Sequence, residues 1–172
     1  MRAGLWGFGV SAVSIIDAEV RELVRRRGVD PVIDPGAVRR LVDEVVAEYE
    51  DRSVGGGLPA LADAQQAARE VFDAVAGFGP LQRYFDDPTI EEIMINEPGR
   101  VFIARQGRNE LTTTILSESE LRDLVERMLK TSGRRVDLSS PFVDALLPDG
   151  SRLHVVIPDI TRRHWAVNIA HQ

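Results

Sequence analysis

Apolar residues recur at helical spacing through the first third of the chain, in two separate stripes. The first stripe follows a capping box formed by Ser14 and Asp17 and ends at Gly28. The second begins at Asp34, with Pro35 at the first helical position. The two stripes predict an N-terminal helical hairpin. Its apolar positions are Ile16, Val20, Leu23, Val24, Val38, Leu41, Val42, Val45, Val46 and Tyr49.

A glycine-rich segment, residues 52–59, follows the second stripe. Three consecutive glycines do not favour a helix or strand, so this segment is predicted to be a flexible linker. A third apolar stripe, from Leu61 to Val75, predicts another helix. We therefore expect residues 1–51 to be a helical extension, 60–160 a separate domain and 161–172 a C-terminal tail. Residues 58–158 are expected to fold without the first two helices.

The pattern changes after residue 88, where short β-rich runs replace the helical stripes. Residues 93–95, 101–103 and 111–115 predict an antiparallel meander. A capping box at Ser117 and Glu120 then predicts a helix that Gly133 ends. Apolar residues alternate on both sides of residues 148–151, which predicts a hairpin. The expected fold class is α+β, with an N-terminal helical hairpin followed by an antiparallel sheet and packed helices.

Composition narrows the chemistry that the chain can perform. The 172 residues include no cysteine and three histidines, so we expect neither a disulfide framework nor a cysteine or histidine metal site. The formal net charge of −6 hides an asymmetry, because residues 1–99 carry a charge of −8 and residues 100–172 a charge of +2. A small anion therefore fits the second part best, and we expect no nucleic-acid binding.

No sequence motif for nucleotide hydrolysis is present. The pattern G-x-x-x-x-G-K-[ST] does not occur, and no nucleophile or pair of carboxylates at catalytic spacing takes its place. We assign no catalytic residue and do not expect this chain alone to hydrolyse ATP.

Three motifs together carry a family resemblance. They are Gly79-Pro-Leu81, the run D-P-T-I-E-E-I-M-I-N at residues 87–96, and D-A-L-L-P-D-G-S-R at residues 144–152. In this combination the chain resembles the N-terminal domain of the ATPases that drive type II and type IV secretion and tight-adherence (Flp) pili, in particular the CpaF-like branch. The resemblance covers roughly residues 60–160, and residues 161–172 are atypical of it.

The resemblance implies a nucleotide contact at Arg152, the last residue of the third motif. Arg135 is a second candidate, although the favoured interpretation of Arg134 and Arg135 is an arginine pair stabilised by the dipole at a helix C-terminus. For Arg152 the competing interpretation is a solvated side chain at the exit of a hairpin. Two further arginines that the family places here are missing, because Leu146 and Ala170 stand at their positions.

The resemblance also implies partners. Such a domain packs against a RecA-like ATPase domain or a full-length secretion ATPase, in an oligomer, and ATP with Mg²⁺ is expected only when that domain is joined or docked. Inner-membrane platform proteins are further expected partners of a cytoplasmic protein peripheral to the membrane. The alternative is a regulatory or small-molecule-binding domain that kept the fold outside a motor, which the missing arginines favour.

Overall fold

The computed structural model describes residues 10–134, 141–158 and 163–172. The chain divides into two compact units, one up to Gly79 and one from Pro80 onward. No helix among the described residues has both the length and the apolar character needed to cross a membrane.

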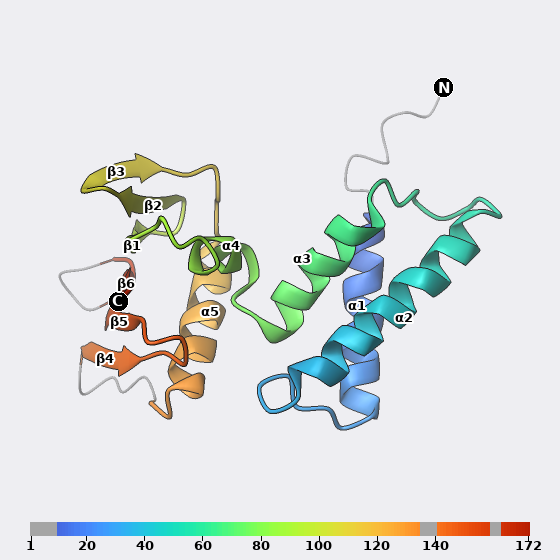
Figure 1. Cartoon of the computed structure of the whole chain (residues 1–172), viewed down its shortest axis with the longest axis horizontal. Coiled ribbons are helices and arrows are strands. Elements are labelled where there is room, and N and C mark those ends of the chain that lie inside the picture. Colours follow the sequence, from blue (N-terminus) through green and yellow to red (C-terminus); the bar gives the residue numbers. More distant parts are fainter. Residues whose placement is uncertain (1–9, 135–140, 159–162) are drawn as a thin grey trace. The chain divides into compact units, whose positions relative to one another are not determined.

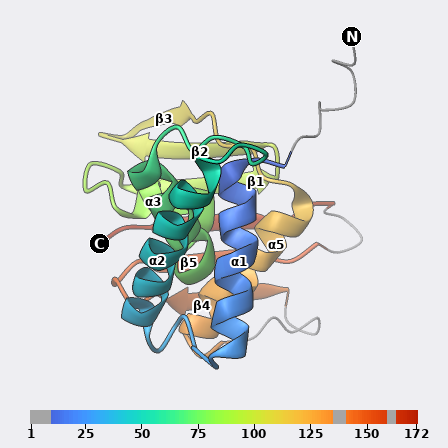
Figure 2. The ribbon, with the colours of Figure 1, turned by 90° about the vertical axis from the view of Figure 1, so that its right-hand side faces the viewer.

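The first unit consists of three helices that pack on one another: α1 (Ala12–Arg26), α2 (Pro35–Ser53) and α3 (Ala64–Ala76). Figures 1 and 2 show them side by side. Each begins at a capped residue, because the side chains of Ser11, Asp34 and Asp63 accept hydrogen bonds from backbone N–H groups of the first turn. The predicted cap at Ser14 is thus wrong by one turn. The buried core joins all three helices and includes Ile16, Val20, Val38, Val42, Val45, Tyr49, Val71 and Val75.

The division between units differs from the one expected from the sequence. α3 packs on α1 and α2, and the compact unit ends at Gly79 instead of at the segment 52–59. The physical reason is that Val71 and Val75 are buried in one core with the first two helices, and Ala64, Ala68 and Phe72 pack against this core. The hydroxyl of Tyr49 in α2 donates a hydrogen bond of 2.5 Å to the carbonyl of Pro59, at the end of the expected linker. The helical hairpin is therefore part of a three-helix unit.

The second unit contains a six-stranded antiparallel sheet in the order β3-β2-β1-β6-β5-β4. It opens with a short 3-10 turn, Gly79–Leu81, and α4 (Gln82–Phe85). The strands are β1 (Glu92–Glu97), β2 (Arg100–Arg105), β3 (Arg108–Leu111), β4 (Phe142–Leu146), β5 (Arg152–Val156) and β6 (Ala166–Ala170), and α5 (Glu118–Thr131) lies beside them (Figure 1). The expected α+β class is confirmed.

Two details of the sheet differ from the sequence prediction. The third strand is Arg108–Leu111 instead of residues 111–115. The expected tail, residues 161–172, contains β6, which pairs with both β1 and β5. β6 belongs in the sheet because Val167 and Ile169 alternate with half-exposed residues and lie in the core.

A strained turn joins β2 and β3. Gln106 has a φ of 49°, in the left-handed region, and Gly107 follows with a φ of 72°. The Glu91 carboxylate accepts hydrogen bonds from the backbone N–H groups of Gln106 (2.8 Å) and Gly107 (3.3 Å), which hold this geometry in place.

We expect Gln106→Gly to raise the free energy of unfolding of the second unit by about 0.5–1 kcal/mol, because glycine adopts a left-handed φ without a Cβ clash. Gln106→Ala is the matched control, since it removes the same polar atoms and keeps the Cβ. The measurement is urea unfolding. A glycine variant no more stable than the alanine variant would show that the turn holds no strain.

Candidate functional site

The sheet has one covered face and one open face. Strand residues on the covered face, such as Ile93, Leu153 and Ile169, are buried, as are Leu121 and Val125 of α5. On the other face, the outward residues of β1, β4, β5 and β6 are exposed or half-exposed. The open face is therefore the part of the second unit where polar chemistry is available to a ligand or partner.

Strand register brings the positions singled out by the family motif into one row on this face. Arg152 in β5 pairs with Leu146 in β4 on one side and with Ala170 in β6 on the other. Ala170 in turn pairs with Glu92 in β1. We call these four residues the Arg152 row. Neighbouring strands lie about 4.8 Å apart, so three arginines here would form a continuous cationic strip. This chain has one.

Arg152 is exposed, and within the residues that the structure describes its side chain makes no hydrogen bond or ion pair. A guanidinium is always charged and offers a planar fork of donors that matches two oxygens of a phosphate or carboxylate. Leu146, with 63% exposure, and Ala170 donate nothing. The row therefore offers a single anion contact.

A second row runs next to the first, with one residue between them on each strand. Asp144 in β4 pairs with His154 in β5, and His154 pairs with Asn168 in β6. The Nδ1 of His154 donates to the Asp144 carboxylate at 2.6 Å, and the ring of Phe142 lies nearly parallel to the imidazole with 6.3 Å between centroids. An open hollow of roughly 210 Å³ lies here, lined by Met94, Asn96, His154, Ala166, Val167 and Asn168.

Both carboxylates on these rows already have a donor. Asp144 accepts from His154, and Glu92 of the Arg152 row accepts a hydrogen bond from the Asn168 side-chain amide. The described part of the chain holds no group of three or more histidine, aspartate and glutamate side chains suited to a metal ion.

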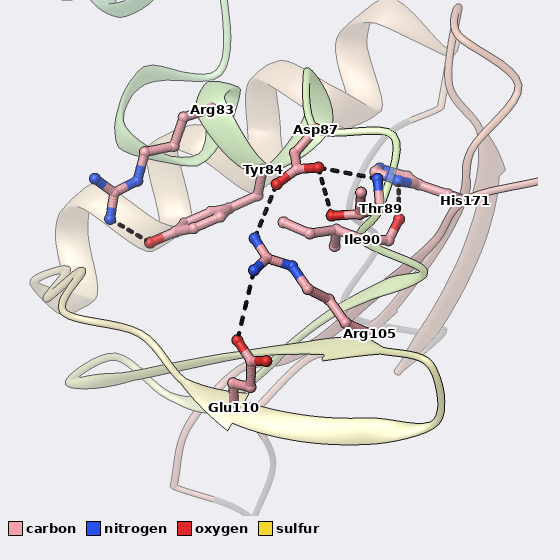
Figure 3. A network of polar contacts seen from close by, with 8 residues as sticks. All are labelled: Arg83, Tyr84, Asp87, Thr89, Ile90, Arg105, Glu110 and His171. Carbon is pink, nitrogen blue, oxygen red and sulfur yellow. Dashed lines mark hydrogen bonds and ion pairs between the residues drawn. The ribbon is translucent and has the colours of Figure 1, made fainter.

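A polar network lies at the end of the sheet that carries the Arg152 row, on the covered side of the sheet (Figure 3). The backbone ladder continues one residue past the strands, because His171 N–H donates to the Glu91 carbonyl at 2.9 Å. The His171 Nδ1 donates to the carbonyl of Ile90 at 2.6 Å. Arg105 donates to the Asp87 carboxylate at 2.8 Å and faces Glu110 at 3.8 Å. The two His171 bonds hold the end of β6, and with it Ala170 beside Arg152.

The Asp87 carboxyl of this network has a lowered pKa. Hydrogen bonds from the side chain and backbone of Thr89 are the main cause, and the nearby Arg105 guanidinium adds to it. Because the folded pKa is below the ordinary value of about 3.9, these contacts stabilise the fold above that pH. Their contribution is lost as the pH falls through the lowered pKa.

The predicted site residues have different outcomes. Arg152 lies on the open face, next to the two positions where arginines are missing. Arg135 lies outside the described residues, and Arg134 is exposed just beyond the C-terminus of α5. His154 points outward, as the alternation with Leu153 and Val155 predicts. Its bond to Asp144 was not predicted, although the hairpin pattern already places the two residues opposite each other.

Comparison with known proteins places the second unit within a known protein family. Residues 74–170 match the sequence model of the type II/IV secretion system protein family. An uncharacterized protein of Methanocaldococcus jannaschii is 31% identical over 97 residues, which are 55% of this chain and 13% of that protein. Protein VirB11 of Agrobacterium fabrum is 32% identical over 81 residues, 46% of this chain and 23% of VirB11. The matches thus span less than a quarter of these relatives.

Among solved structures, the VirB11 ATPase from the Brucella suis type IV secretion system, crystallised with sulphate, is 29% identical. The similarity covers 54% of this chain and 29% of that protein, with a TM-score of 0.49. Because the family match covers more than half of its residues, this chain belongs to the type II/IV secretion system protein family.

Proposed function

We propose that the chain is the N-terminal module of a type II/IV secretion motor, and that it docks on a RecA-like ATPase domain and lends Arg152 to the phosphates of a nucleotide bound there. The observation that carries the proposal is the exposed guanidinium of Arg152 on the open sheet face, which has no hydrogen-bond or ion-pair partner among the described residues. Family membership supports the motor context.

The Arg152 row has too few donors to bind a nucleotide by itself, so most contacts to the nucleotide come from the partner domain. One guanidinium on an open surface cannot enclose a triphosphate, and Leu146 and Ala170 add no donor. ATP, Mg²⁺ and the hydrolytic machinery are therefore supplied by the ATPase domain, and the module contributes one charge-assisted contact. The CpaF-like motifs favour a tight-adherence (Flp) pilus motor, assembled as an oligomer in the cytoplasm against inner-membrane platform proteins.

The test is a chimera of Agrobacterium fabrum VirB11 in which the matching segment is replaced by that of this chain. We expect Arg152→Ala to weaken nucleotide binding by about 1.5–3 kcal/mol, roughly 10- to 150-fold, because a hydrogen-bonded charge pair is lost. A fluorescent nucleotide titration measures the affinity. Arg122→Ala is the matched control, since Arg122 in α5 pairs only with Glu126 among the described residues.

Equal affinities of the chimera and its Arg152→Ala variant would show that Arg152 is a solvated hairpin residue. Binding by the isolated chain decides the alternative, a regulatory domain for a small molecule. The hollow beside His154 and the missing arginines favour that alternative. Saturable nucleotide binding without any ATPase domain would establish it and displace the motor proposal.

A further inference from the structure

Within the part of the chain that the structure describes, Arg152 has no hydrogen-bond or ion-pair partner, even though two carboxylates lie within its reach. Asp144 lies diagonally across β4, because it pairs with His154 while Arg152 pairs with Leu146. Diagonal neighbours in an antiparallel pair are about 7–8 Å apart at Cα, a distance that long side chains span. Glu92 lies two strands away in the Arg152 row, about 10 Å distant, with only the small side chain of Ala170 between them.

Each of these carboxylates accepts a hydrogen bond from a side chain of the second row. The His154 Nδ1 donates to Asp144 at 2.6 Å. The Phe142 ring of β4 lies nearly parallel to the imidazole, with 6.3 Å between the ring centroids. The Asn168 amide donates to Glu92. Asp144 stays mostly exposed, at 80%, so its orientation depends on the His154 contact and not on burial.

We infer that His154 and Asn168 are positioning residues that keep Arg152 free. Each holds one carboxylate away from the guanidinium, which would otherwise form an intramolecular ion pair and compete with phosphate. The expected effect on nucleotide binding rests on the proposed function of Arg152. The ion pairing of Arg152 with Asp144 or Glu92 does not, because it involves this chain alone.

The first test uses the chimera and a rescue. We expect His154→Ala to weaken nucleotide binding about two- to fivefold, the range set by an exposed ion pair that must be broken before phosphate binds. Adding Asp144→Asn in the same chain should restore the affinity, because the released side chain no longer carries a charge. The matched control is His154→Ala with Asp123→Asn, an exposed carboxylate on α5 within the matching segment, which should not restore it.

The rescue separates positioning from direct contact. If His154→Ala leaves the affinity unchanged, or if Asp144→Asn fails to restore it, His154 does not act by holding Asp144 and the inference is wrong. The same rescue experiment applies to the second pair, Asn168 and Glu92. Asn168→Ala should weaken binding, and Glu92→Gln added to it should restore binding.

The second test uses this chain alone, so that failure of the proposed function does not obscure the result. The exchange rate of the Arg152 Nε proton with water, measured by ¹⁵N NMR, reports whether the guanidinium is paired. We expect slower exchange in His154→Ala than in the unaltered chain, and a return to the fast rate once Asp144→Asn is added. An unchanged rate in His154→Ala overturns the inference. An Arg152→Ala chimera with unaltered affinity overturns the proposed function and leaves this test intact.

Discussion

A chain that ends at residue 165 is expected to lose the folded sheet. β6 (Ala166–Ala170) hydrogen bonds to β1 on one side and to β5 on the other, so its removal separates β3-β2-β1 from β5-β4. The core also loses Val167 and Ile169, which are 2% and 0% exposed. An isolated two-stranded hairpin is marginally stable at best in water, and the β5-β4 pair is left as one.

The measurement is the far-ultraviolet circular dichroism and thermal unfolding of residues 80–165. The matched control is residues 80–172, which contains the whole second unit and is expected to unfold cooperatively. A cooperative transition in the fragment that lacks β6 would contradict the central position of this strand.

The same reasoning reverses an expectation from the sequence. Residues 58–158 were predicted to fold without the first two helices, but this fragment lacks β6 and retains α3 without the helices that it packs on. A fragment of residues 80–172 matches the second compact unit and is therefore the fragment expected to fold by itself.

Local patterns predicted most individual elements and few of their partners. The capping box at Ser117 and Glu120 and the alternation of the β4-β5 hairpin are confirmed, because both depend on residues close in sequence. Helical spacing in α3 predicts an apolar stripe and not the surface that covers it. Trp165, Val167 and Ile169 alternate as strand residues do, but residues 161–172 were predicted to be a tail. The place of β6 between β1 and β5 depends on pairing with residues far away in the chain.

In the candidate site, too, local sequence indicated individual residues but not which of them lie side by side. The family resemblance pointed to Arg152, Leu146 and Ala170, but their arrangement in one row follows from the register of three strands. The carboxylates of Asp144 and Glu92 lie within the quoted motifs, but the motifs do not reveal that both come near Arg152. Glu92 meets Asn168 only because β1 pairs with β6, a contact between residues 76 positions apart.

The second large effect is expected at Tyr49, in the core of the three-helix unit. Its side chain is 0% exposed, and its hydroxyl donates to the Pro59 carbonyl, which holds the segment between α2 and α3 against α2. We expect Tyr49→Ala to lower the free energy of unfolding of this unit by about 3–5 kcal/mol, the cost of a large aromatic cavity. Tyr49→Phe keeps the ring and is expected to cost about 1 kcal/mol, the net value of one hydrogen bond.

Hydrogen exchange of the full chain, read peptide by peptide, distinguishes this unit from the sheet. In Tyr49→Ala, amides of α1, α2 and α3 should lose protection together, because one core joins the three helices. Amides of β1 and β6 should keep theirs, since they belong to the other compact unit. Val54→Ala is the control, at a side chain that is 87% exposed. If α3 kept its protection while α1 and α2 lost theirs, α3 would be stabilised independently of the helical hairpin, and the unit boundary would return to the glycine-rich segment.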